Sequence, residues 1–287
     1  MDKRKILIQL DSDPQPSVFD RVVAVDAGAE EIFSHGNVRI AEVQALVHGA
    51  IFTRGPKDLK NTAIFIGGSD VAAGERLLAE VVKHMIPAFG LRVSVLLDAN
   101  GANTTAAAAV RAAARHLDLA DTTALVLAGT GPVGQRVALL LARQGATVRV
   151  GSRQHDRAAA VCDQIREKAP TARLEPVATS GDLTAALNGC VLVVAAGAAG
   201  IQLLPNSAWR GCSTLKVAVD LNAVPPLGIE GIDVTDKAKE RDGVIGYGAI
   251  GVGDTKMKIH KAAIAKLFER NDLILDAEEV YALGEGL

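Results

Sequence analysis

The chain has 287 residues, of which 49% are apolar and 22% are charged, so it can form one large or two medium domains with buried cores. The formal net charge of -2 and the aromatic content of 3% argue against a nucleic-acid binder, which would carry a basic excess and stacking rings. The same charge argues against an anionic-membrane binder, and no run of about 18 apolar residues is present to span a membrane.

The cysteines and histidines give no sign of a disulfide framework or a metal site. Cys162, Cys190 and Cys212 are widely spaced without a C-x-x-C pair, and the six histidines form no H-E-x-x-H pattern. The first apolar run, residues 6–10, is too short for the apolar core of a signal peptide. We therefore expect a soluble cytoplasmic protein that holds no metal.

Strands and helices are predicted to alternate along the chain. Short apolar runs predict strands at residues 6–10, 22–25, 63–67, 93–97, 124–128, 147–150, 191–195 and 217–221. Helical patterns follow Asp70, cover the alanine-rich residues 103–117, lead from Gly131 to Gly145, and return at residues 255–269 and 276–287. This alternation predicts an α/β fold.

We expect two domains with the active site in the cleft between them. Residues 1–120 should form an α/β substrate domain, residues 121–252 a Rossmann-type dinucleotide-binding domain, and residues 253–287 C-terminal helices that pack back on the first domain. The second boundary is placed where residues 246–254, GYGAIGVGD, are rich in glycine.

The motif Gly129-Thr130-Gly131-Pro132-Val133-Gly134 predicts the dinucleotide site. It follows an apolar strand and opens an amphipathic helix, which is the context that makes a G-x-G-x-x-G sequence specific. Gly129 permits the tight turn, Gly131 lets the backbone approach the pyrophosphate, and Gly134 lets the helix pack close to the strand. The pyrophosphate is expected on free N–H groups at the helix N-terminus.

The end of the next strand indicates which dinucleotide binds. NAD enzymes usually carry an acidic residue there for the ribose hydroxyls, but this chain has Ser152 and Arg153 and no acid before Asp156. A guanidinium group suits a 2′-phosphate, which an acid would repel. We therefore predict NADP, with NAD possible.

Later strand ends supply further candidates for the cofactor site. Ala196 and Gly197 end one strand with small side chains, and Asp220 and Asn222 end another. Ligands of open α/β sheets bind at the carboxyl ends of strands, so both segments are candidate walls of the cofactor site, although ordinary loop chemistry would also explain them.

Segments spread along the chain resemble the bacterial NAD(P)-dependent methylene-tetrahydromethanopterin dehydrogenases of one-carbon metabolism. The similar segments are residues 16–20, 62–68, 72–75, 98–107, 127–134, 220–223 and 225–229, followed by Lys256, Lys258, His260 and residues 265–268. The resemblance covers nearly the whole chain and is far more specific than the glycine loop alone.

The resemblance implies hydride transfer from methylene-tetrahydromethanopterin, and in some relatives methylene-tetrahydrofolate, to NADP or NAD. The implied assembly is a homo-oligomer, a trimer or hexamer. The implied pterin contacts are Ser17, Phe19, Asp20, Asp98, Asn100, Asn103 and Thr104. From the residues alone, Ser17, Asp20, Asn103 and Thr104 could equally cap local turns and helices. The best-known NADP members carry a lysine after the arginine, and this chain has Gln154 there.

The sequence lacks a Tyr-x-x-x-Lys acid/base pair, and the reaction that the resemblance implies does not need one. Only Tyr247 and Tyr281 are present, so a Tyr-x-x-x-Lys acid/base pair cannot form, and a cyclohydrolase activity that depends on one is not expected. Oxidation of a methylene group between two nitrogens needs no base, because the nitrogen lone pairs expel the hydride.

Lys256 is the predicted catalytic residue. It follows the glycine-rich stretch, where Asp254 or Thr255 could cap a new helix, and a cation in a first turn opposes the helix dipole at a cost of up to about 1 kcal/mol. Such a local disadvantage hints at function, although a solvated face shared with other lysines is the simpler explanation. The resemblance implies that Lys256 orients the pterin.

Two other functions are compatible with a Rossmann domain. One is a dehydrogenase of a small hydroxy acid, similar to shikimate dehydrogenases, which would need Lys57 or Lys60 to form an acid/base pair with Asp98. The other is a protein that senses NADP without catalysis.

Overall fold

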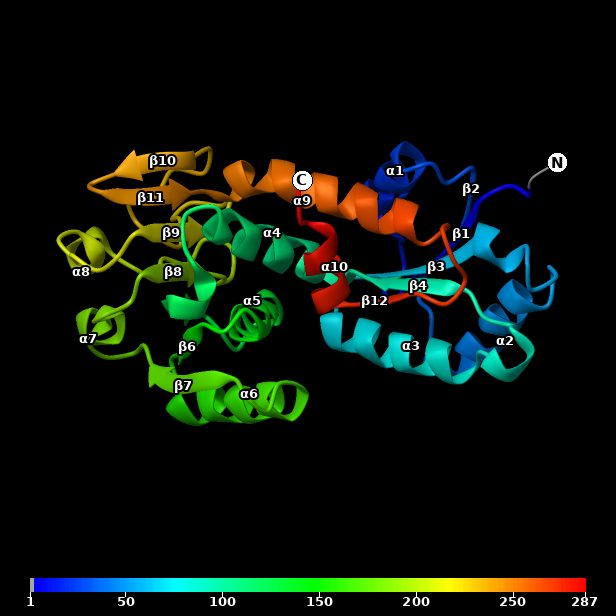
Figure 1. The fold of residues 1–287 in the computed structure, drawn as a ribbon, viewed down its shortest axis with the longest axis horizontal. Helices are drawn as coiled ribbons and strands as arrows, with labels where there is room; N and C mark the ends of the chain where they lie inside the picture. Colours follow the sequence, from blue (N-terminus) through cyan, green and yellow to red (C-terminus); the bar gives the residue numbers. More distant parts are fainter. Residues whose placement is uncertain (1–2) are drawn as a thin grey trace. The chain divides into compact units, whose positions relative to one another are not determined.

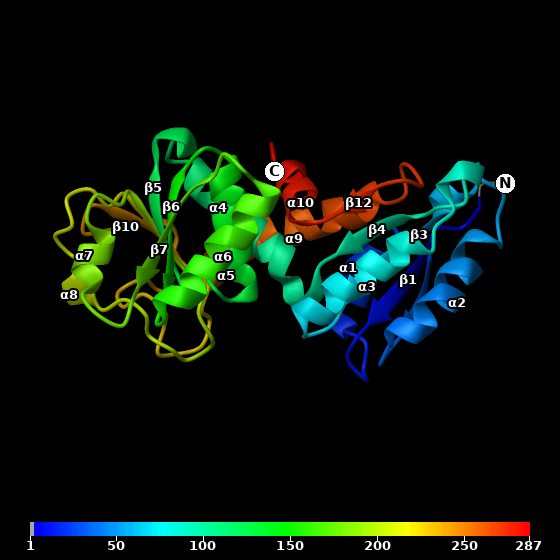
Figure 2. The ribbon, with the colours of Figure 1, turned by 90° about the horizontal axis from the view of Figure 1, so that it is seen from below.

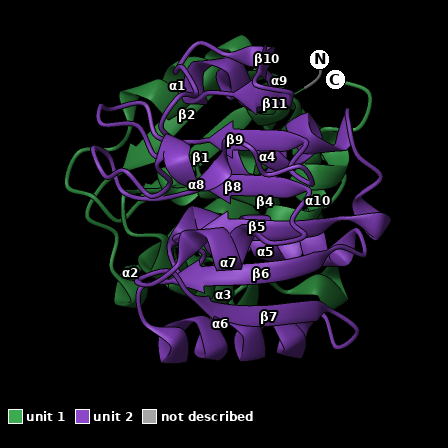
Figure 3. Cartoon of the chain, turned by 90° about the vertical axis from the view of Figure 1, so that its left-hand side faces the viewer, with its two compact units in different colours: residues 1–104, 257–287 green, residues 105–256 purple. Residues whose placement is uncertain are grey.

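The computed structural model describes residues 3–287, and the chain divides into two compact units (Figure 3). Unit 1 comprises Met1–Thr104 and Met257–Leu287, and unit 2 comprises Thr105–Lys256. Both divisions fall inside helices, the first inside α4 (Ala102–Ala114) and the second inside α9 (Ala249–Lys266). The predicted boundary at residue 120 lies after the end of α4, and the one at residue 252 lies in the first turn of α9.

Unit 1 contains a five-stranded parallel sheet in the order β12-β4-β3-β1-β2. The strands are β1 (Ile6–Asp11), β2 (Glu31–His35), β3 (Thr62–Gly67), β4 (Ser94–Leu97) and β12 (Ile274–Leu275). The helices are α1 (Val18–Asp26), α2 (Ile40–Ile51), α3 (Val71–Lys83) and α10 (Ala277–Leu283), with the C-terminal part of α9. Figures 1 and 2 show α2 and α3 side by side on one face, with α1 and α9 on the other.

Unit 2 contains a seven-stranded sheet in the order β10-β11-β9-β8-β5-β6-β7, parallel except for β10. The strands are β5 (Thr123–Leu127), β6 (Thr147–Ser152), β7 (Arg173–Ala178), β8 (Leu192–Ala195), β9 (Val217–Asp220), β10 (Lys237–Arg241) and β11 (Val244–Tyr247). The helices are α5 (Pro132–Arg143), α6 (His155–Lys168), α7 (Leu183–Leu187) and α8 (Asn206–Trp209), with the C-terminal part of α4.

Both sheets have strand orders of doubly wound folds. Without β10, the strands of unit 2 follow the order 3-2-1-4-5-6 of Rossmann domains, and those of unit 1 follow the flavodoxin-like order 2-1-3-4-5. The order reverses between β5 and β8 in unit 2, and between β1 and β3 in unit 1. Ligands bind at the carboxyl ends of strands at such reversals. The predicted α/β fold with a Rossmann-type domain is confirmed.

Several predicted elements differ from the structure. Residues 22–25, predicted as a strand, belong to α1, because Ser17 caps this helix and the side chains of Val23 and Ala24 turn to the core on a helical period. The sequence also did not predict five strands: β2 and β7 each lie at the edge of their sheet, β10 reads KAKER, β11 reads VIGY over only four residues, and β12 has two residues. Of the helices, α2, α6, α7 and α8 were also not predicted.

The glycine-rich segment spans the end of β11, at residues 246–247, and the start of α9, at residues 249–254. A Cβ at Gly248 would lie 2.0 Å from the Asp233 carbonyl oxygen, and one at Gly251 would lie 1.8 Å from that of Asp236. Glycine is therefore required where the first turn of α9 packs on this backbone. The helix begins at Ala249, so Asp254 and Thr255 lie inside it, and the prediction that Lys256 occupies a first turn is wrong.

The start of α4 is fixed to the end of β4 by buried polar groups. Asp98 is 1% exposed, and its carboxylate accepts hydrogen bonds from the Thr104 backbone N–H at 3.0 Å and from the Thr104 hydroxyl at 2.7 Å. The Asn103 amide donates to the Leu97 carbonyl oxygen at 2.6 Å and to Asp276 Oδ1 at 2.8 Å. These side chains therefore connect β4, α4 and the start of α10.

Replacing Thr104 by valine should destabilise the protein without changing its fold. Thr104→Val is nearly isosteric but removes a hydroxyl donor from a buried carboxylate, so we expect a loss of about 1–3 kcal/mol in the free energy of unfolding. Chemical denaturation would measure it. Thr105→Val, on the same turn at a half-buried position, changes helix propensity equally and serves as the control. An equal loss in both variants would contradict the role of the Asp98 bond.

Candidate functional site

The glycine loop after β5 has the shape that a dinucleotide requires. Ala128 adopts a positive φ of 53°, and α5 then begins at Pro132 with Gly131 as its N-cap. A Cβ at Gly134 would lie 2.5 Å from the Ala128 carbonyl oxygen, and one at Gly129 would lie 2.9 Å from Val150 Cγ1. The prediction that glycines let this helix pack against its strand agrees with these distances.

The N-terminus of α5 offers backbone donors to an anion. No side chain in the described part of the chain caps this helix at Gly131, and Pro132 at its first position has no N–H to satisfy. The N–H groups of Val133 and Gly134 lie in the first turn, where a helix leaves its donors without intrahelical acceptors. Thr130 contributes its carbonyl oxygen to the loop by accepting from Gln135 Nε2 at 2.8 Å. The loop therefore fits a pyrophosphate.

The end of β6 places Ser152 and Arg153 beside each other in different environments. Ser152 is 7% exposed, and its hydroxyl accepts from the Gln154 backbone N–H at 3.3 Å. The side chain of Arg153 is exposed. Because β6 runs parallel to its neighbour β5, both residues lie at the carboxyl ends of the strands, as the glycine loop does. An exposed guanidinium group at that edge fits a 2′-phosphate.

The ends of β8 and β9 lie at this edge too. Asp220 is 1% exposed, and its carboxylate accepts from the backbone N–H groups of Asn222 at 3.0 Å and Ile229 at 2.8 Å. Burial raises the pKa of Asp220, although these backbone donors lower it in part. Asn222 accepts from the Val224 N–H at 3.0 Å and donates to the Pro226 carbonyl oxygen at 3.1 Å. Both side chains therefore shape the loop over residues 221–229.

Two small residues, Ala196 and Gly197, directly follow the carboxyl end of β8. A Cβ at Gly197 would lie 2.7 Å from Leu203 Cδ1, so a larger residue there would require the Leu203 side chain to move. The predicted cofactor residues thus converge on one edge of the unit 2 sheet, at its strand-order reversal.

In unit 1, the corresponding edge is organised by Asp11, which the sequence did not single out. Asp11 ends β1, is 1% exposed, and accepts from the N–H groups of Asp13 at 2.8 Å and Ser17 at 3.2 Å. Burial raises the pKa of Asp11, and the two backbone hydrogen bonds counteract this in part. An aspartate directly after an apolar strand was the signal available in the sequence.

The residues implied as pterin contacts fall into two groups at the carboxyl ends of the unit 1 strands. Ser17 caps α1, its hydroxyl accepting from the Asp20 N–H at 3.2 Å, and the side chain of Phe19 is 50% exposed. Asn100 lies after β4 with a φ of 54°, and its N–H donates to the Gly68 carbonyl oxygen at 2.6 Å. Asp98, Asn103 and Thr104 are 1% exposed or less and hold the start of α4.

Lys256 lies in the third turn of α9 with a half-buried side chain. Among the other lysines of this helix, Lys258 is exposed, whereas Lys261 and Lys266 are half-buried like Lys256 and form ion pairs with Asp26 at 2.8 Å and with Glu269 at 2.6 Å.

The acid/base pair needed for a shikimate-type reaction is not formed. Lys57 and Lys60 are exposed and precede β3, at the amino end of that strand, whereas Asp98 follows the carboxyl end of its parallel neighbour β4. The two lysines and the aspartate thus lie at opposite edges of the sheet. No group of three His, Cys, Asp or Glu side chains within residues 3–287 could hold a metal ion.

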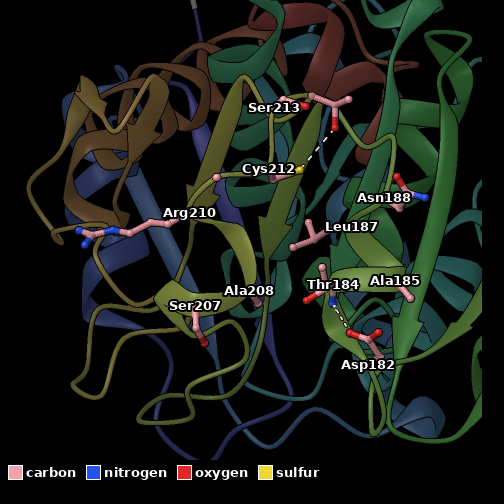
Figure 4. Close-up of a pocket in the computed structure, with 12 residues that line it drawn as sticks. Asp182, Thr184, Ala185, Leu187, Asn188, Ser207, Ala208, Arg210, Cys212 and Ser213 are labelled. Atoms are coloured by element: carbon pink, nitrogen blue, oxygen red, sulfur yellow. Dashed lines mark hydrogen bonds between the residues drawn. The ribbon is translucent and has the colours of Figure 1, made fainter.

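A separate cavity of about 450 Å³ lies at the opposite edge of the unit 2 sheet (Figure 4). Its lining comes from α7 and α8 and the segments that lead into β8 and β9, including Asn188, Ser207 and Cys212. Because these segments precede parallel strands, the cavity lies at the amino ends of β8 and β9, away from the glycine loop. It is therefore not the dinucleotide site.

Comparison with known proteins identifies the relatives of this chain. The family model for the N-terminal part of methylene-tetrahydromethanopterin dehydrogenase matches residues 18–100. The bifunctional protein MdtA of Methylorubrum extorquens is 46% identical over 98% of this chain and 98% of its own length. The NAD(P)-dependent methylenetetrahydromethanopterin dehydrogenase of the same organism is 31% identical over 98% of this chain and 97% of its own length.

Solved structures with this fold are more distant in sequence. The 5-ketofructose reductase of Gluconobacter sp. strain CHM43 is 18% identical, with a TM-score of 0.56 over 99% of this chain and 98% of that chain. The quinate dehydrogenase from Corynebacterium glutamicum in complex with NAD is 16% identical, with a TM-score of 0.52 over 99% of both chains. At these identities the likeness establishes the fold alone.

Among the three cysteines, Cys212 should be the one that reacts with alkylating reagents. Partial burial raises the pKa of the Cys212 thiol, but hydrogen bonds from the Thr214 hydroxyl and from the N–H groups of Leu215 and Thr214 outweigh this and lower it. Burial raises the pKa of both Cys162 and Cys190. We expect iodoacetamide to label Cys212 at least about tenfold faster, because the thiolate is the nucleophile.

Peptide mass spectrometry over a time course would measure the three rates in one sample. Thr214→Val should slow the labelling of Cys212 and leave the other two cysteines unchanged. Similar rates at Cys190 and Cys212 would contradict the expected difference.

Proposed function

Because the chain belongs to the methylene-tetrahydromethanopterin dehydrogenase family, we propose that it transfers a hydride from methylene-tetrahydromethanopterin to NADP and produces the methenyl form. The observation that carries the proposal is the 31% identity, over nearly the full length of both chains, to a relative named for this reaction. The glycine loop and the exposed Arg153 at the carboxyl edge of the unit 2 sheet support the cofactor.

The residues that would hold the dinucleotide are those at the unit 2 edge. The N–H groups after Gly131 would receive the pyrophosphate, and Ser152 with Arg153 would receive the ribose and its 2′-phosphate. Ala196 and Gly197 would leave room for the nicotinamide, and Asp220 with Asn222 hold the adjoining loop in place. When bound, NADP supplies the hydride acceptor.

The pterin side of the reaction is assigned to unit 1 and Lys256. Phe19 presents a half-exposed ring at the carboxyl end of β1, where a flat pterin could stack, and Asn100 lies after β4 in a tight turn. Lys256 would donate hydrogen bonds to the pterin ring and orient the methylene carbon. A base is unnecessary, because the lone pairs of the flanking nitrogens stabilise the cation that forms.

The proposal includes a homo-oligomer in the cytoplasm, a trimer or hexamer as the resemblance implies. Val18, Val22 and Val25 are 57–59% exposed along one face of α1, an apolar strip suited to contact with another subunit. All three cysteines are free, as expected in a reducing compartment. No helix within residues 3–287 is long and apolar enough to cross a membrane.

Removing the Arg153 side chain should weaken the binding of NADP selectively. Arg153→Ala loses a charge-assisted contact worth about 1.5–3 kcal/mol, which raises the KM for NADP by about 10- to 100-fold. The KM for NAD should remain nearly unchanged, and steady-state assays with both cofactors would measure the two values. Arg157→Ala, an exposed arginine on the following helix, is the matched control. Equal effects of Arg153→Ala on both cofactors would refute the phosphate contact.

Replacing Lys256 by alanine should impair turnover of the pterin and leave the fold intact. Misalignment of a hydride donor can cost on the order of 100-fold in rate, so kcat/KM for the pterin should fall by about that factor. The Kd for NADP and the Tm should stay near their wild-type values. Lys258→Ala, two residues further along the same helix at an exposed position, serves as the control. Activity within about threefold of wild type in Lys256→Ala would rule out the orienting role.

A further inference from the structure

A further cavity, of about 370 Å³, lies within unit 1 between α2 and the sheet. The sheet lines it with Ile6 and Ile8 of β1, Phe33 of β2 and Thr62 of β3. The strand register pairs Ile6 with Thr62 and Ile8 with Phe33, so these side chains share one face of the sheet. None of the residues assigned above to the pterin or to NADP lines this cavity. The proposed reaction therefore leaves it without a role.

The cavity is open because α2 presents small residues to this part of the sheet. Ala45, Gly49 and Ala50 line it from the helix, and a Cβ at Gly49 would meet no atom within 4 Å. On the strand side, Phe33 is 50% exposed. The volume lies in the range of small-molecule sites, about 300–1,000 Å³, and such sites combine apolar walls with a few polar groups.

Two polar groups lie together near the amino end of β3. Thr62 is the first residue of this strand and is 3% exposed, and its hydroxyl has no hydrogen-bond partner within residues 3–287. Arg54 Nη1 donates to the carbonyl oxygen of Asn61, the residue before Thr62, at 2.7 Å. The described part of the chain offers no other acceptor to Arg54, so four of the five guanidinium N–H donors remain for a ligand.

The charge and the length of the cavity indicate the kind of ligand. Arg54 and His35 are its only ionisable side chains among the described residues, and none of these lining residues is acidic. A guanidinium group is always protonated and binds carboxylates through charge-assisted hydrogen bonds. Thr62 lies at the register of Ile6 and His35 at that of Leu10, so the cavity extends about 13 Å along the strands.

We propose that this cavity binds a medium-chain monocarboxylate. The carboxylate accepts hydrogen bonds from Arg54 and from the Thr62 hydroxyl, which thereby gains the acceptor that it lacks in the free protein. The alkyl chain extends along Ile8 and Phe33, where it covers apolar surface that is otherwise exposed to water. This site is independent of the proposed reaction, because it uses none of the residues assigned to the two reactants.

The test is a calorimetric titration of the intact protein with octanoate. Octanoate should bind saturably, with one molecule per chain, and octylammonium, which has the same chain length and the opposite charge, should bind at least about tenfold more weakly. Arg54→Gln should weaken octanoate binding by about tenfold, because a neutral amide replaces the cation. Lys60→Gln removes a nearby exposed cation that does not line the cavity, and should leave the affinity unchanged.

Two further variants separate ligand binding from effects on folding. Thr62→Val removes a hydroxyl that has no partner in the free protein, so the Tm should stay the same or rise while octanoate binding weakens by about threefold to tenfold. Gly49→Leu should fill the open space and abolish binding without lowering the Tm, because leucine has the higher helix propensity. Gln44→Leu, at an exposed position on the same helix, should leave binding unchanged.

Three results would overturn the proposal. Octanoate binding that survives Gly49→Leu, or that saturating NADP or tetrahydromethanopterin displaces, would place the ligand at another site. Equal affinities for octanoate and octylammonium would refute recognition of the carboxylate by Arg54. Absence of octanoate binding to the wild-type protein would refute the site itself, and a changed oligomeric state of Gly49→Leu would then indicate that another subunit fills the cavity.

Discussion

The loops that leave the carboxyl ends of buried parallel strands must satisfy their backbone N–H groups without a neighbouring strand. This chain meets the requirement with a buried aspartate at three such ends: Asp11 is the last residue of β1, Asp220 is the last residue of β9, and Asp98 directly follows β4. Each is 1% exposed, and each accepts at least one hydrogen bond from the backbone of the loop or helix that follows. Each loop that follows β1, β4 or β9 is therefore held by hydrogen bonds to a buried carboxylate.

The same carboxylates are poorly suited to act as catalytic bases. Their oxygens accept hydrogen bonds from backbone N–H groups and, at Asp98, also from the Thr104 hydroxyl, and rotation of a carboxylate would break these bonds. A reaction that required a base at these strand ends would conflict with their structural role. Hydride loss from a carbon between two nitrogens makes no such demand, so the buried aspartates can serve the loops alone, and the proposed orienting role of Lys256 does not require them to act as bases. The structural use of these acids and the proposed chemistry are therefore compatible.

The sequence predicted the parts of the fold whose signals are local. The glycine loop could be recognised because its three glycines stand at fixed spacing between a strand and a helix, and Gly134 is required by a backbone atom only six residues away. The buried strands β5, β8 and β9 are short and mostly apolar. The strand predicted at residues 22–25 shows where local signals fail: a run of valines favours a strand, and only packing in the folded chain selects the helix. The role of Asp11 was not predicted, because its partner Ser17 is fixed by the path of the intervening loop.

The glycines at the start of α9 meet a steric constraint that the sequence pattern does not reveal. Gly248 and Gly251 read as a flexible loop, yet both are needed because backbone atoms of residues 233–237 occupy the space where a Cβ would lie. Because glycine has no Cβ, the helix can begin at Ala249, more than one turn before the start at residue 255 that the sequence pattern predicted. This early start sets the register of the whole helix, and with it the face on which Lys256 and His260 lie. A larger side chain at Gly251 would shift or unwind the first turn, so a residue with no functional group of its own determines where the proposed pterin-orienting lysine is placed.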